Sequence, residues 1–216
     1  MTNSLEDPKV KGVLERLFAA AALDDEAAER LPRRPAASAS ARERADALDT
    51  IYMPISAQAG ILLYGLVRAI RPRTVVEFGT SFGISTLHLA AGVADVGHGR
   101  MLTTELSTAK IAAAQANLDE AGLTEHVTIL PGDARESLAD VPAPVDFVLL
   151  DGWKDLCLQV LRLLEPKLAP GTLVVADDVN LASLQAYLDY VRDPANGYAS
   201  VTFPVEDGME ISCWTA

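Results

Sequence analysis

The feature that most constrains the fold is a regular alternation, from Thr74 onward, of short apolar runs with segments of helical length. Strands that alternate with helices form a parallel sheet with helices on both faces, so we expect an α/β, doubly wound, Rossmann-like fold. The strand-like runs are Thr74–Phe78, Met101–Glu105, Val127–Leu130, Val145–Leu150, Thr172–Ala176, Ser200–Phe203 and Glu210–Trp214. The helical segments are Ile84–Val93, Thr108–Ala121, Lys154–Leu168 and Leu181–Val191.

The first 52 residues have a different pattern, and we expect them to form a helical extension to a main domain at residues 53–216. Apolar residues after Pro8 follow helical spacing, which predicts a short amphipathic helix. The Leu31–Pro35 segment breaks this pattern, and the Ala/Ser/Arg-rich residues 36–49 favour a further helix or a mobile arm. Another helix is predicted over Ser56–Ile70.

Charge and composition exclude several classes of protein. Residues 74–216 carry 7 Lys and Arg against 20 Asp and Glu, a net charge of −13 that would repel nucleic-acid phosphates. No apolar run reaches the ~18–20 residues of a membrane helix, so we expect no membrane partner. The two cysteines, Cys157 and Cys213, form no disulfide framework, which favours a reducing, cytoplasmic location.

Acidic residues end most of the predicted parallel strands. In open α/β sheets, ligands bind outside the carboxyl ends of the strands, so these acids mark the edge where a site is expected. The strand ends read Glu77-Phe-Gly79, Glu105, Gly132-Asp133, Asp151 and Asp177-Asp178.

The first strand end has features of a cofactor site. Gly79 and Gly83 allow the backbone to approach a ligand closely, but their spacing lacks the G-x-G-x-x-G pattern of dinucleotide-binding proteins. Glu105, at the end of the second strand, is placed to accept hydrogen bonds from ribose hydroxyls. Asp133 could bind an adenine amino group or form the turn before a short helix, and the sequence leaves both open.

The strongest group is Asp151, Lys154, Asp177 and Asp178, which follow two strands that we expect to be neighbours. Carboxylates brought so close repel one another unless a cation neutralises them, and oxygen ligands suit Mg²⁺ or another hard divalent cation. A lysine beside such a cation can act as a base. The alternative is that the aspartates cap helices and the lysine is solvated.

A second reaction class competes for the first turn. Gly79-Thr-Ser81-Phe-Gly83 also matches the G-x-S-x-G nucleophile elbow of serine hydrolases. That mechanism needs an acid and then a histidine later in the chain. No histidine follows Asp151 or Asp177, and a Ser81–Glu105–His126 arrangement stays possible. His126 precedes a strand, at the edge opposite to the expected site, which disfavours the hydrolase.

With these residues in view, the chain resembles the cation-dependent class I S-adenosylmethionine (SAM) O-methyltransferases, which include the catechol and caffeoyl-CoA enzymes. Leu150–Asp155 is similar to the metal-and-lysine segment of the catechol enzymes, with Gly152 in place of a histidine. The segments Met53–Gly60, Glu77–Thr80 and Asp207–Ile211 also resemble family segments.

The resemblance implies a seven-stranded, mostly parallel sheet with an antiparallel last strand, and a cytoplasmic protein that is often a homodimer. It implies a small, catechol-like acceptor, Asp151, Asp177 and Asp178 as ligands of Mg²⁺ or another divalent cation, and Lys154 as the catalytic base. Asp178 departs from the family's usual asparagine, which should change cation affinity. The residues implied to line the SAM pocket are Ile55, Glu77, Gly79, Thr80, Ser85, Glu105, Ala134 and Asp151.

Two further functions stay open within this resemblance. Some bacterial relatives methylate a hydroxylated uridine in tRNA, and arginines of the N-terminal segment could contact its phosphates. These are Arg30, Arg33, Arg34, Arg42 and Arg44. The chain could also bind SAM without catalysing a transfer.

Overall fold

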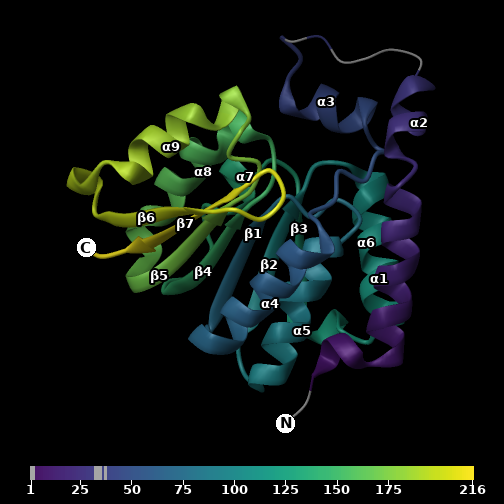
Figure 1. The fold of residues 1–216 in the computed structure, drawn as a ribbon, viewed down its shortest axis with the longest axis horizontal. Coiled ribbons are helices and arrows are strands. Elements are labelled where there is room, and N and C mark those ends of the chain that lie inside the picture. The colour runs from purple at the N-terminus through teal and green to yellow at the C-terminus, as the bar shows by residue number, and fades with distance from the viewer. Residues whose placement is uncertain (1–2, 32–35, 37) are drawn as a thin grey trace.

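A seven-stranded sheet forms the centre of the molecule (Figure 1). The structure is a computed structural model that describes residues 3–31, 36 and 38–216. The strand order is β3-β2-β1-β4-β5-β7-β6, with β1 to β5 parallel and β7 antiparallel to both of its neighbours. The predicted α/β fold with an antiparallel last strand is confirmed. The strands are β1 Thr74–Phe78, β2 Arg100–Glu105, β3 Val127–Pro131, β4 Val145–Leu150, β5 Leu168–Ala176, β6 Tyr198–Phe203 and β7 Met209–Trp214.

Helices cover both faces of the sheet and enclose two apolar layers. One face is covered by α1 Pro8–Ala21, α4 Ala57–Ile70, α5 Ile84–Val96 and α6 Thr108–Ala121. The other is covered by α7 Ala134–Ser137, α8 Cys157–Leu164 and α9 Gln185–Arg192. The central strands β1 and β4 are therefore buried on both sides, which explains their nearly continuous apolar sequence.

Polar residues at the helix starts satisfy backbone groups that the helices leave unpaired. Asp7 caps α1 by accepting a hydrogen bond from the Lys9 amide, and Ser56 caps α4 by accepting one from Ala59. Between these helices lie two short ones, α2 Asp24–Glu29 and α3 Ala41–Ala47. In Figure 1 they lie beyond the carboxyl edge of the sheet, where the site is expected.

One predicted helix is wrong in its extent. The segment Lys154–Leu168 contains a 3₁₀ turn at Lys154–Leu156, then α8, then a second 3₁₀ turn at Glu165–Lys167, and Leu168 already begins β5. Pro166 explains the early end of α8, because proline has no amide hydrogen to donate within a helix. None of the helices in the described part of the chain has the length and apolar character needed to cross a bilayer.

Candidate active site

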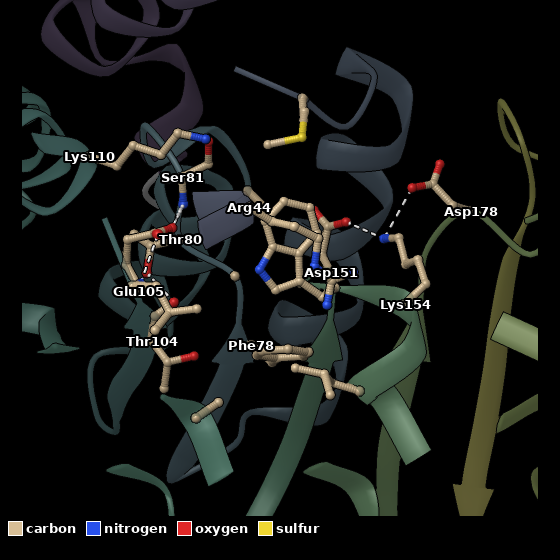
Figure 2. Close-up of a pocket in the computed structure, with 18 of the residues that line it drawn as sticks. Arg44, Phe78, Thr80, Ser81, Thr104, Glu105, Lys110, Asp151, Lys154 and Asp178 are labelled. Carbon is tan, nitrogen blue, oxygen red and sulfur yellow. Dashed lines mark hydrogen bonds and ion pairs between the residues drawn. The ribbon is translucent and has the colours of Figure 1, made fainter. Parts of the chain in front are cut away.

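A cavity of about 610 Å³ opens above the carboxyl ends of β1, β2 and β4, and its volume suits a small ligand (Figure 2). It lies at the point where the strand order reverses, between β1 and β4. Three of the predicted site residues, Glu77, Gly83 and Asp177, do not line it. The predicted residues that do are Ile55, Gly79, Thr80, Ser85, Glu105, Asp133, Ala134, Asp151, Lys154 and Asp178.

The turn after β1 forms the floor of the cavity. Gly79 has a φ of +106°, and a Cβ there would lie 2.7 Å from the carbonyl oxygen of Asp151. The turn is held to β2 by the amide and hydroxyl of Thr80, which both donate to the Thr104 carbonyl at 3.0 Å. Glycine is therefore required at position 79 by both conformation and space.

Glu77 lies beneath this floor, fully buried. Its carboxylate accepts hydrogen bonds of 2.6 Å from the hydroxyls of Ser85, Thr86 and Thr103. Burial raises the pKa of Glu77 to about 7, although the three hydroxyls partly oppose this change. Because Ser85 lines the cavity, Glu77 can act on a ligand by fixing the position of that side chain.

Glu105 lies at one side of the cavity together with Ser81 and Lys110 (Figure 2). Its carboxylate accepts hydrogen bonds from three backbone amides: Ser81 at 2.9 Å, and Leu106 and Ser107 at 2.8 Å. These contacts fix both oxygens at the cavity wall. Oε1 accepts two of the three bonds, while Oε2 accepts one and has acceptor capacity left for a hydroxyl. Burial lowers the pKa of Lys110, and the nearby charge of Glu105 opposes this change.

For Asp133 the structure shows the turn-forming role. Its side chain caps α7 by accepting a hydrogen bond from the Arg135 amide at 2.9 Å, and it pairs with the Arg135 guanidinium at 2.6 Å. This pairing lowers the pKa of Asp133. The residue lines the cavity, but with its carboxylate already engaged.

The acidic cluster forms at the opposite side, as the sequence predicted. Oxygens of Asp151, Asp177 and Asp178 lie within 4.8 Å of one another. Figure 2 shows the Lys154 ammonium between two of these carboxylates, 2.8 Å from Asp151 and 3.0 Å from Asp178. Three carboxylates at this separation match the oxygen ligands of a hard divalent cation, so the residues present fit such an ion.

Electrostatics within the cluster are strong because it is largely removed from water. Burial and the neighbouring charge of Asp151 raise the pKa of Asp177 to about 8. Burial opposes the charge of Lys154, but the carboxylates of Asp151 and Asp178 outweigh it and raise the pKa of that ammonium. Asp178 has a φ of +60°, a conformation that aspartate tolerates better than most residues.

Several cavity residues were not predicted from the sequence. Tyr52 and Met53 lie over the cavity, and the Tyr52 ring stacks on Phe82 with 3.9 Å between centroids. Trp153 also lines the cavity. It belongs to the Leu150–Asp155 segment, but the sequence predicted no role for it. Arg44 was considered only as a contact for RNA phosphates, because its partner Asp155 is 111 residues away in the chain.

The structure disfavours the serine hydrolase and the methylation of tRNA. The Ser81 hydroxyl donates to the Tyr52 carbonyl at 2.7 Å, and no histidine is among the described residues that line the cavity. Of the arginines considered for RNA, Arg42 and Arg44 bind Leu106 and Asp155, and Arg30 pairs with Glu26. Arg33 and Arg34 lie outside the described residues.

The fold and cavity define a Rossmann-like protein with a small-molecule site at the carboxyl edge of its sheet, and comparison with known proteins identifies the class. A methyltransferase domain model matches residues 76–179. A catechol O-methyltransferase from Mycobacterium tuberculosis is 32% identical over 144 residues, which cover 66% of this chain and 64% of the relative. One from Sus scrofa is 31% identical over 147 residues, covering 65% of this chain and 78% of the relative.

A crystal structure of cofactor-bound Rv0187 from MTB is 25% identical and superposes with a TM-score of 0.69, covering 92% of this chain and 89% of that one. The chain belongs to the class I SAM-dependent O-methyltransferase family and is similar to its catechol O-methyltransferases. It spans 64%, 64% and 58% of the length of three catechol O-methyltransferases that it matches.

Proposed function

We propose that this protein is a SAM-dependent O-methyltransferase that methylates a hydroxyl of a small, catechol-like acceptor with the help of a divalent cation. The observation that carries the proposal is the position of Lys154, which lies beside three carboxylates at the edge of a cofactor-sized cavity. A cytoplasmic location and a homodimeric state stay predictions from the resemblance.

The cofactor half of the proposal rests on the turn after β1 and on Glu105. The close approach of Gly79 to the Asp151 backbone keeps the cavity floor thin and free of side chains. Oε2 of Glu105 has acceptor capacity for a ribose hydroxyl, and Ser85, whose hydroxyl donates to Glu77, offers its oxygen as an acceptor at the cavity wall. When bound here, SAM would supply an electrophilic methyl group.

The acceptor half rests on Asp151, Asp177 and Asp178, which would hold the cation. A divalent cation there would supply Lewis-acid chemistry that lowers the pKa of an acceptor hydroxyl. Lys154 holds its proton at Nζ as long as Asp151 and Asp178 face it. When these carboxylates have another partner, Nζ can lose that proton and take one from the acceptor hydroxyl.

Much of the rate would come from holding two reactants in near-attack geometry. Exposed apolar side chains of Met53 and Leu181 border the cavity and are suited to pack against the ring of an acceptor. Asp178 adds a negative charge where the family usually has asparagine, so we expect tighter cation binding than an amide ligand would give.

The test is a calorimetric titration of the protein with SAM, first in EDTA and then with Mg²⁺, with a simple catechol added last. We expect SAM to bind in both conditions and catechol to bind only with Mg²⁺ present. SAM binding without any effect of the cation would refute the cation-assisted mechanism. A protein that binds SAM and catechol but transfers no methyl group would be a binding protein without catalysis.

A further inference from the structure

Helix α3 of the N-terminal segment is fixed to the main sheet at two points next to the cavity. The Arg42 guanidinium donates to the Leu106 carbonyl at 2.6 Å, just after β2. The Arg44 guanidinium forms two parallel hydrogen bonds to Asp155, of 2.9 and 3.0 Å, just after β4. The helix therefore bridges the carboxyl ends of two strands that lie on either side of β1.

Arg44 also packs on an aromatic wall of the cavity. Its guanidinium carbon lies 4.6 Å from the centre of the Trp153 ring, and both residues line the cavity. The Nε atom of Arg44 is buried and has no hydrogen-bond partner among the described residues. The two carboxylate oxygens of Asp155 and the face of the Trp153 ring thus hold the guanidinium from two sides. The guanidinium in turn fixes the tilt of the indole.

This wall belongs to the Asp133 end of the cavity. Arg44 and Trp153 line the same cavity as Asp133 and Ala134, which start α7, and the charge of Arg42 acts on Asp133. The Phe78 ring fills the space next to Gly152, the residue before Trp153, where a Cβ would lie only 2.6 Å from the ring. Trp153 and Phe78 therefore give this end of the cavity flat apolar surfaces, which suit an aromatic ring.

We infer that the N-terminal segment completes the cofactor site, with Arg44 as a positioning residue that holds Trp153 against the adenine of SAM. The inference rests on the proposed function, because it takes SAM as the ligand. Arg44 acts through Trp153 and Asp155, since both of its Nη atoms bind Asp155 and its Nε is buried. Cofactor affinity then depends on a helix that lies outside the matched methyltransferase domain.

The experiment measures SAM affinity and Trp153 fluorescence together. The protein has two tryptophans, so Trp214→Phe leaves Trp153 as the only one. SAM is titrated into the Trp214→Phe chain and into the same chain carrying Arg44→Ala or Asp155→Asn. The Trp214→Phe chain carrying Arg30→Ala is the matched control. The Arg30→Ala substitution also removes one positive charge from the N-terminal segment. Arg30 pairs with Glu26 and does not line the cavity.

We expect Arg44→Ala to weaken SAM binding about tenfold and to shift the emission of Trp153, because the indole loses the cation on its face. Asp155→Asn should change both readouts in the same direction, and the double variant should be little worse than either single one. Arg30→Ala should behave like the background chain. Thermal unfolding of each variant checks that the fold is retained. If Arg44→Ala does not fold, the SAM affinity and Trp153 emission of Asp155→Asn test the inference.

Unchanged SAM affinity in both Arg44→Ala and Asp155→Asn would overturn the inference while leaving the proposed function intact. Tighter binding in Asp155→Asn would also overturn it, because Arg44 would then act by its charge and not by its position. If the Trp214→Phe chain and the unchanged chain both fail to bind SAM, the proposed function itself is wrong and the inference falls with it.

Discussion

At the scale of single residues, the proposed chemistry depends most on Lys154. Lys154→Met keeps a side chain of similar length but removes the ammonium that bridges Asp151 and Asp178. We expect methyl transfer to catechol to fall by about 10²-fold or more, the usual loss when a general base is removed. SAM affinity should be unchanged, because the ammonium lies in the acidic cluster and not at the Glu105 side of the cavity.

The assay follows a labelled methyl group from SAM to catechol, with SAM affinity measured by calorimetry on the same samples. Lys11→Met is the control, since Lys11 lies on the exposed side of α1 and its ammonium pairs with Glu6 at 3.8 Å. Full activity of Lys154→Met with SAM bound would remove Lys154 as the base.

The buried carboxyl of Glu77 predicts a pH dependence of stability. Its pKa is about 7 in the folded protein against 4.5 in the unfolded chain, so the folded state binds the extra proton between these values. The stability that Glu77 contributes is therefore fully present below about pH 4.5 and is lost as the pH rises through about 7. The loss should be about 3 kcal/mol, since each pKa unit corresponds to about 1.4 kcal/mol.

Urea unfolding of the unchanged chain and of Glu77→Gln between pH 4.5 and pH 8 isolates this contribution. The difference in unfolding free energy between the two chains should shift in favour of Glu77→Gln as the pH rises. A difference that stays constant over this range would show that Glu77 does not titrate there.

At the scale of elements, the turn that joins β1 to α5 is the most constrained part of the site. Gly79→Ala puts a Cβ 2.7 Å from the Asp151 carbonyl oxygen at a φ of +106°. Gly171→Ala is the matched control, because Gly171 has a φ of +92° with nothing within 4 Å of the added atom. We expect Gly171→Ala to cost about 1–2 kcal/mol of stability from its backbone conformation alone.

Gly79→Ala should cost more than this and should also abolish SAM binding, because β4 must move away from the turn. Urea unfolding gives the first quantity and calorimetry the second. Equal destabilisation by the two substitutions would mean that the close approach of the two backbones does not constrain the cavity floor.

The same scale separates what the sequence could predict from what it could not. Strand and helix ends such as Val145–Leu150 and Thr108–Ala121 were predicted correctly, because apolar periodicity reports burial directly. The acidic cluster was predictable because the carboxyl ends of parallel strands meet at one edge. The contact of Arg44 with Asp155 was not, since nothing local in either segment records a partner 111 residues away.

At the scale of the whole molecule, the N-terminal segment is packed into the same core as the helices of the main sheet. Helix α1 lies on α5 and α6, and its apolar side is fully buried among them. Arg16 adds polar contacts to α6, pairing with Glu120 and donating to the Asn117 side chain at 3.1 Å. Helix α1 therefore covers apolar surface that residues 53–216 would otherwise expose to water.

We accordingly expect residues 53–216 alone to lose cooperative unfolding and SAM binding, although they contain the whole sheet. In the full chain, Leu17→Ala should cost about 2–5 kcal/mol, because Leu17 is 1% exposed and its loss leaves a cavity over α5 and α6. Glu15→Ala, on the exposed side of the same helix, should change stability by less than about 0.5 kcal/mol. Urea unfolding followed by circular dichroism measures all three. If the shorter chain unfolded cooperatively and bound SAM as tightly as the full chain, then α1 and α3 would be accessory to both the fold and the site. The position of Val10, Val13 and Leu17 in the central core argues against that outcome.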